Sequence, residues 1–140
     1  MKKPLRCAIM CDSTTFPTFE AEVIKKLQAT NRAEIVLLIT NPEKQKKFKK
    51  VKRFKHILFH AYQHLYVNPT TGAFKKQDLS KELNNIPQLT CATIKEGYGE
   101  YFSPEDIQKI KAYKLDFIVR FSYNIIRGGI LSIAKYGVWS

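Results

Sequence analysis

The sequence predicts a three-layer α/β domain built on a mostly parallel, twisted sheet. Apolar runs of strand length alternate with segments whose apolar residues recur at helical spacing, and this order builds strand-helix-strand units. One run, from Ala33 to Ile39, is apolar almost throughout, as expected of a parallel strand covered on both faces. The 140 residues suit one domain, 1–140, with a single sizeable core.

The first 39 residues predict one strand-helix-strand unit. Leu5 to Cys11 is the first expected strand, and Asp12, Ser13, Thr14 and Thr15 form a turn rich in residues that cap helices. An amphipathic helix follows, because apolar side chains recur at helical spacing. These side chains are Phe19, Val23, Ile24 and Leu27. The strand at 33–39 completes a unit that is right-handed in nearly all proteins.

The middle of the chain predicts helix and turns. Glu43 to about Tyr66 is expected to form a strongly basic helix, or two helices, and the turn residues of Asn68 to Gly72 must break it. Asp78 to Leu83 is at most a short helical turn. Leu89 to Ile94 is a strand candidate, and Glu96 to Glu100 is expected to be a loop.

The last third predicts helix, strand, loop, helix and strand. Ser103 and Pro104, followed by two acids, indicate a helix start with a serine N-cap. Leu115 to Ser122 is an apolar strand, after which Arg127-Gly128-Gly129 interrupts the pattern. Ile130 to Tyr136 has helical spacing, with Gly137 at the place of a helix C-cap, and Val138 begins another strand.

Composition indicates a cytoplasmic globular protein with anionic partners. The formal net charge of +12 favours nucleic acid, phosphorylated substrates or acidic surfaces without choosing among them. No run approaches the roughly 18 apolar residues of a membrane helix, so no membrane partner is expected. The amino-terminal apolar stretch is interrupted by Arg6 and ended by Asp12, which indicates a strand and not a signal peptide.

The cysteines and histidines do not predict a metal site. Three cysteines without a C-x-x-C pair indicate neither a disulfide framework nor a zinc site, so we interpret Cys7, Cys11 and Cys91 as small buried hydrophobes. His56, His60 and His64 would line one stripe of a continuous helix. The outer two would then lie about 12 Å apart, too far for all three to bind one ion, and a packed or solvated stripe is the other interpretation.

The carboxyl-terminal stretch carries a family resemblance. The run D-F-I-V-R-F-S-Y-N-I-I-R-G-G-I-L, followed by K-Y-G-V-W-S, resembles the stretch that precedes the catalytic Asn-x-His motif of 10-formyltetrahydrofolate-dependent formyltransferases. Methionyl-tRNA, glycinamide ribonucleotide and sugar formyltransferases share that pattern. The matching residues are Asp116, Ser122, Tyr123, Ile126, Tyr136 and Gly137. Ser140 stands where the family has its Asn.

The resemblance implies a Rossmann-like amino-terminal domain with two binding loops. The first would bind the pterin of the donor, 10-formyltetrahydrofolate, through its backbone and through Ile125 and Ile126, although a core role for Ile126 is equally open. Arg127 would face the acidic tail of the folate or be solvated. The full donor loop is Ser122, Tyr123, Asn124, Ile125, Ile126 and Arg127. The second, Asp12 to Thr15, would lie near the acceptor substrate, and helix capping by Ser13 or Thr14 is its alternative role.

The implied reaction transfers a formyl group from the donor to an amine, and no metal takes part. Ser140 is the only catalytic candidate, at the family's Asn position. The family's catalytic His and Asp would lie beyond Ser140, so the domain is expected to be incomplete at its carboxyl end. The 140-residue chain alone is therefore expected to show no formyl transfer, and its acceptor amine and oligomeric state cannot be deduced.

Two other classes remain open. The chain could be a non-catalytic binding module, for RNA or for a partner subunit, or an unrelated nucleotide-binding α/β protein. The RNA interpretation rests on the eight basic side chains among the twelve positions from Lys44 to Lys55, which could neutralise several phosphates. A solvated helix face is the alternative interpretation of the same run.

If the basic run binds RNA, affinity should fall steeply as salt rises, because each phosphate contact releases counterions. Neutralising Lys46, Lys49, Lys50 and Arg53 together should weaken binding without altering the fold, as measured by filter binding and circular dichroism. An unchanged affinity in that variant would contradict RNA binding by this run.

Overall fold

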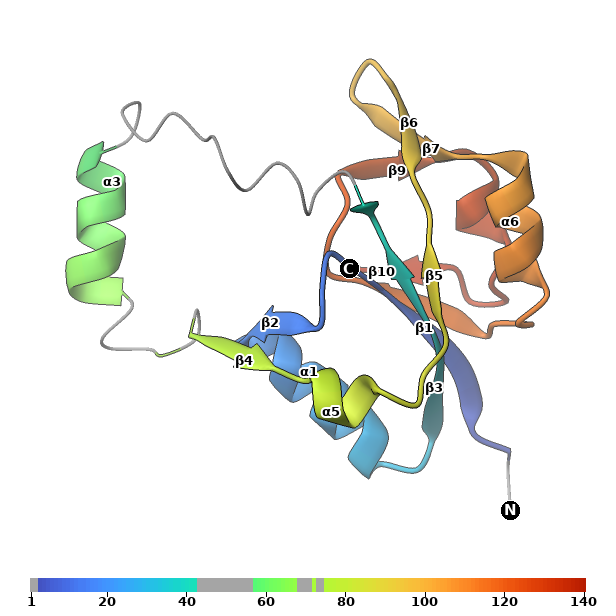
Figure 1. Cartoon of the computed structure of the whole chain (residues 1–140), viewed down its shortest axis with the longest axis horizontal. Helices are drawn as coiled ribbons and strands as arrows, with labels where there is room; N and C mark the ends of the chain where they lie inside the picture. Colours follow the sequence, from blue (N-terminus) through green and yellow to red (C-terminus); the bar gives the residue numbers. More distant parts are fainter. Residues whose placement is uncertain (1–2, 43–56, 68–71, 73–74) are drawn as a thin grey trace.

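The computed structural model describes residues 3–42, 57–67, 72 and 75–140, and it confirms the predicted fold class. Five parallel strands form the central sheet, with helices on both faces (Figure 1). Their order across the sheet is β10 (Val138–Trp139), β8 (Phe117–Arg120), β1 (Leu5–Cys11), β3 (Ala33–Thr40) and β5 (Gln88–Thr90).

The order of the strands reverses between β1 and β8. The chain moves outward from β1 to β3 and β5, then returns to place β8 on the other side of β1, and β10 outside β8. This is the strand order of Rossmann-like sheets, in which ligands bind outside the carboxyl ends of the strands at the reversal.

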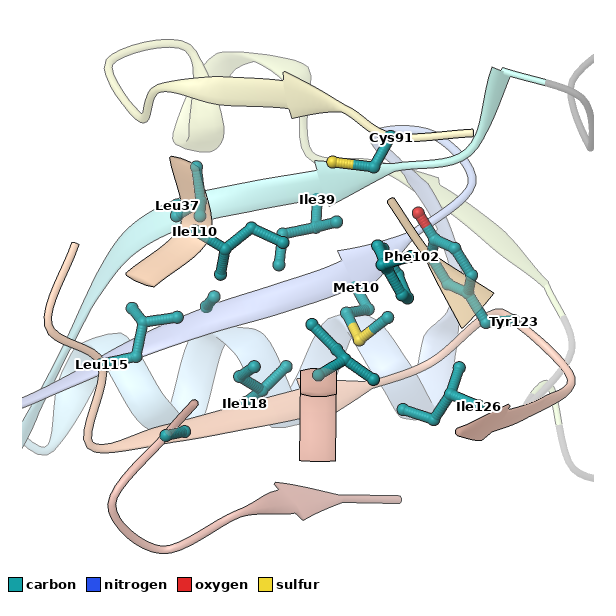
Figure 2. Close-up of a cluster of buried hydrophobic side chains, with 13 residues drawn as sticks. Met10, Leu37, Ile39, Cys91, Phe102, Ile110, Leu115, Ile118, Tyr123 and Ile126 are labelled. Carbon is teal, nitrogen blue, oxygen red and sulfur yellow. The ribbon is translucent and has the colours of Figure 1, made fainter. Parts of the chain in front are cut away.

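Alternating side chains of β1 enter two separate cores. Cys7 and Ile9 pack on the face covered by α1 (Thr18–Ala29) and α5 (Ser80–Leu83), whereas Ala8 and Met10 pack on the other. That second core includes Ile110 of α6 (Pro104–Lys111), and Figure 2 shows it around Met10, Ile39 and Ile118. The sheet is therefore the middle of three layers.

Helix α1 differs in two ways from the prediction. Strand β2 (Thr15–Pro17) separates it from the Asp12 turn, and its N-cap is Pro17, so neither Ser13 nor Thr14 caps it. Its buried residues are Ala21 and Ile24. Phe19 and Val23 are 47% and 41% exposed, because this part of the helix lies beside an open groove and not on the sheet.

Only the end of the predicted helix from Glu43 to Tyr66 lies among the described residues. It forms α3 (Ile57–Tyr62) and a π-helical turn, η1 (Gln63–Val67). Their apolar side chains are exposed, with Leu58 at 84% and Leu65 at 69%. After them, β4 (Lys76–Asp78) pairs antiparallel with β2.

The strand predicted from Leu89 to Ile94 is two strands in different sheets. Strand β5 ends at Thr90, and β6 (Thr93–Glu96) forms a hairpin with β7 (Gly99–Phe102). The expected loop at 96–100 is therefore the tip of this hairpin and the start of β7.

Helix α6 begins as predicted. Ser103 is its N-cap, and the Ser103 Oγ accepts a hydrogen bond from the Asp106 N–H at 3.1 Å. Pro104 occupies the first turn together with Glu105 and Asp106, whose negative charges favour a helix N-terminus.

The segment between β8 and β10 departs from the predicted helix at 130–136. A strand, β9 (Ile125–Arg127), is followed by a 3-10 helix, η2 (Gly128–Ser132), and then by turns. Gly137 has φ +75°, the conformation expected of a capping glycine, but it follows a turn and not an α-helix. Strand β10 then pairs with β8 as the sequence predicts.

The three cysteines are free and buried, in agreement with their interpretation as core residues. Burial raises the pKa of Cys7 to about 11 and those of Cys11 and Cys91 to about 12, so these thiols stay protonated and unreactive. Among the described residues, none of the helices combines the length and the apolar character needed to cross a bilayer.

Truncation of Ile118 should strongly destabilise the domain. Ile118 is fully buried in β8, so Ile118→Ala removes its packing and leaves a cavity, at a cost of about 2 to 5 kcal/mol in the free energy of unfolding. Ile94→Ala, at a side chain that is 56% exposed, should cost about 1 kcal/mol or less. Denaturation in urea measures both, and equal costs would contradict the burial of Ile118.

Candidate ligand site at the carboxyl edge of the sheet

Polar side chains gather where the parallel strands end. Asp12 follows β1, Asn41 follows β3, Ser122 lies two residues after β8, and Ser140 follows β10. Because the strands are parallel, all these residues lie at the same edge of the sheet. The predicted donor loop and the predicted acceptor segment follow β8 and β1, the two strands between which the order reverses.

The donor loop begins with a tightly held turn. The N–H groups of Phe121 and Ser122 donate to the Met10 carbonyl at 3.0 and 3.3 Å. Tyr123 has φ +78°, a backbone conformation that is uncommon for a bulky residue. Its ring lies against Phe102, with 5.4 Å between ring centroids, and Figure 2 shows the two side chains together.

The second half of the donor loop is a strand, which the sequence did not predict. Strand β9 pairs in parallel with β7 and forms the edge of a three-stranded sheet ordered β6-β7-β9. Gly99 pairs with Ile125, and a Cβ at position 99 would meet the Arg127 side chain at 2.9 Å, so the arginine would have to move aside for a larger residue. The outer edge of β9 pairs with no other strand of the described residues.

Because side chains alternate along β9, Ile125 and Ile126 have different surroundings. Ile125 is 54% exposed and lines a cleft, whereas Ile126 is 7% exposed and belongs to the core with Met10. Of the two roles open for Ile126, the structure therefore shows the core role. Arg127 is exposed.

An open cleft of about 520 Å³ lies between the β6–β7 hairpin and the donor loop. The hairpin contributes Lys95, Tyr98 and Glu100, and the loop contributes Tyr123, Asn124 and Ile125. Arg120, at the end of β8, also lines it, so two cations flank the cleft. The hairpin wall was not predicted, because the residues from Glu96 to Glu100 have the composition of an ordinary turn.

Two hydroxyl groups of the donor loop, those of Ser122 and Tyr123, are buried. The Ser122 Oγ is inaccessible to solvent and forms no hydrogen bond within the described residues. Burial, with smaller effects from Cys91 and other neighbours, raises the pKa of the Tyr123 phenol above its usual range. The phenol therefore stays neutral at physiological pH.

The segment from Asp12 to Thr15 lies close to the donor loop. The Ser122 N–H donates to the carbonyl of Met10, two residues before Asp12, so the structure brings the two predicted segments together. Within the segment, the Ser13 Oγ accepts a hydrogen bond from the Thr15 N–H at 3.2 Å. The Thr14 carbonyl accepts from the Leu79 N–H at 2.9 Å, which ties the turn to the start of α5.

Ser140 borders a different cavity. An apolar groove of about 480 Å³ runs between α1 and the β8–β10 edge, and Ser140 lies in its lining with Phe19 and Trp139. Arg120 lines this groove as well as the cleft. The Phe117 and Trp139 rings stack beneath it with centroids 4.9 Å apart.

The other sequence candidates lie largely outside the described residues. The basic run from Lys44 to Lys55 and His56 are not among the described residues. His60 and His64 lie in α3 and η1, and the described part of the chain contains no group of three metal-ligating side chains.

A scan against protein-family models found no match for the chain, and a search of curated proteins found none either. The cleft itself offers an exposed isoleucine and two flanking cations. Such a lining suits a ligand with an apolar face and an anionic group, because the isoleucine packs on the face and the cations attract the anion.

Removing the charge of Glu20 should stabilise the fold at neutral pH. Partial burial, and secondarily Asp12, raise the pKa of Glu20, so the folded state disfavours its carboxylate. Because the folded pKa lies above the unfolded one, this penalty is absent at low pH and grows as pH rises through both values. Glu20→Gln should raise Tm by about 1 to 3 °C at pH 7 and by nothing at pH 3.

Glu22→Gln is the matched control, because it removes the same charge from an exposed position of α1. Thermal unfolding followed by circular dichroism compares the two variants. A Tm gain of the same size for Glu22→Gln, or a gain that persists at pH 3, would contradict the argument.

Proposed function

We propose that this chain is a formyltransferase-family domain whose donor, 10-formyltetrahydrofolate, binds in the cleft beside β9. The observation that supports this most directly is the position of the two segments implied by the family resemblance. Asp12 to Thr15 and Ser122 to Arg127 follow β1 and β8, the strands between which the sheet order reverses. Ligands of open parallel sheets bind at that point.

The chemistry of the pterin suits this place. A pterin has two apolar faces and a rim of hydrogen-bond donors and acceptors. Backbone groups of the donor loop that line the cleft would pair with the rim, while the exposed side chain of Ile125 would pack on one face. The glutamate tail carries carboxylates, which Lys95 and Arg120 at the cleft would attract.

In the proposed reaction a neutral amine attacks the formyl carbon, the bond from that carbon to N10 of the donor breaks, and tetrahydrofolate leaves with a proton on N10. The step requires an oxyanion stabiliser and a group that moves a proton from the attacking nitrogen. By resemblance, Ser140 occupies the position of the family's Asn, but it borders the groove beside α1 and not the proposed donor cleft, so we do not propose that this chain catalyses the transfer alone. Asp12 and its neighbours would lie on the acceptor side.

A stable formylated folate, 5-formyltetrahydrofolate, should bind weakly and shift the backbone amide resonances of residues 124–127 in an NMR titration. Ile125→Ala should weaken binding about three- to tenfold, because it removes apolar contact area from the proposed pterin face. Shifts confined to other parts of the chain would overturn the site assignment.

Ile94→Ala is the matched control, since Ile94 is 56% exposed and Ile125 is 54% exposed, and both lie in the same three-stranded sheet. Ile94 does not line the cleft. The control variant should therefore bind with unchanged affinity, and an equal loss in both variants would point to a general effect on the sheet.

A further inference from the structure

Glu100 is a buried carboxylate at the base of the cleft. It lies in β7 with 2% of its surface exposed. Within the described residues no lysine or arginine forms an ion pair with it. Burying a carboxyl group costs free energy unless hydrogen bonds compensate for the lost water, so the hydrogen-bond partners of Glu100 indicate its role.

Both carboxylate oxygens have neutral hydrogen-bond donors. The Asn124 Nδ2 donates to Oε1 at 2.7 Å, and the Thr93 Oγ donates to Oε2 at 3.4 Å. The Thr93 hydroxyl accepts in turn from the Asn41 Nδ2 at 3.2 Å. A hydroxyl can both accept and donate, so Thr93 links the amide of Asn41 to the carboxyl group of Glu100.

Asn124 is also held through its backbone. The Arg120 Nη1 donates to the Asn124 carbonyl at 2.6 Å, which closes the turn between β8 and β9. The preceding residue, Tyr123, has φ +78°, a conformation that persists only where its surroundings stabilise it. Asn124 is therefore the point at which the turn is tied to the hairpin.

We propose that Glu100 is a positioning residue for the donor site: through Asn124 it sets the place of the turn before β9 and of Ile125, which line the cleft. The backbone of Glu100 pairs with Ile126, so one residue holds β9 by its main chain and the preceding turn by its side chain. This role rests on the proposed function, because the ligand it serves is the folate donor.

Exchanging the amide of Asn124 and the carboxyl group of Glu100 tests the role of the hydrogen bond between them. Asn124→Asp places a second carboxylate against Glu100 and should weaken binding of 5-formyltetrahydrofolate at least about tenfold. Adding Glu100→Gln reverses the pair, since Gln Nε2 can donate to the new aspartate while its Oε1 accepts from Thr93. The double variant should recover affinity to within about threefold of the unmodified protein.

Asn85→Asp, in an exposed turn, is the control for the same chemical change and should bind normally. Calorimetric titrations are made well below each Tm, so that every variant is folded. A purely structural role would lower Tm and leave the affinity of the folded protein unchanged, and that result would overturn the proposal. Failure of the double variant to recover would overturn it as well.

Hydrogen exchange at the amides of residues 125–127 gives a second readout that needs no ligand. Exchange should accelerate in Asn124→Asp and return to the original rate in the double variant. If the unmodified protein bound no folate, the proposed function would fail, and exchange would then decide separately whether Glu100 positions β9. Unchanged exchange in Asn124→Asp would overturn the positioning role.

Discussion

Strand β1 is the constraint on which the rest of the molecule depends. It pairs with β3 on one side and β8 on the other, and its alternating side chains enter both cores. A strand buried in this way must lie in the middle of the sheet, so the chain can add strands only outward in each direction. The reversal of strand order beside β1 is the result, and it brings the loops that follow β1 and β8 together at one edge.

Much of this arrangement could be predicted from local sequence. The apolar runs of β1, β3 and β8 indicate buried parallel strands, and Ser103 with Pro104 indicates the start of α6. Prediction failed where the apolar pattern of a segment did not indicate which strand it pairs with. Residues 89–94 have the composition of one strand, yet β5 pairs with β3 and β6 pairs with β7, and only tertiary hydrogen bonds separate them.

The candidate site was predictable to the same extent. The loop after β8 could be located because turn residues follow an apolar strand. The pairing of this loop with the β6–β7 hairpin could not be predicted, since the hydrogen bond between Asn124 and Glu100 joins residues 24 positions apart in the chain. In the sequence Glu100 is an acid near two glycines, a pattern typical of an exposed turn, and nothing local indicates that it is 2% exposed.

The same contacts explain how a short turn can keep an unfavourable backbone conformation. A positive φ at a tyrosine costs on the order of 1 to 3 kcal/mol, which neighbouring interactions must offset. Three contacts around Tyr123 offset this cost. The backbone N–H groups of the two preceding residues donate hydrogen bonds to the Met10 carbonyl, and the Tyr123 ring packs on Phe102. The Arg120 side chain donates a hydrogen bond to the Asn124 carbonyl. Each comes from a different element, so the turn is held from several directions. A turn held in this way has little conformational freedom left to lose, so any ligand that contacts it would pay little entropy for ordering it.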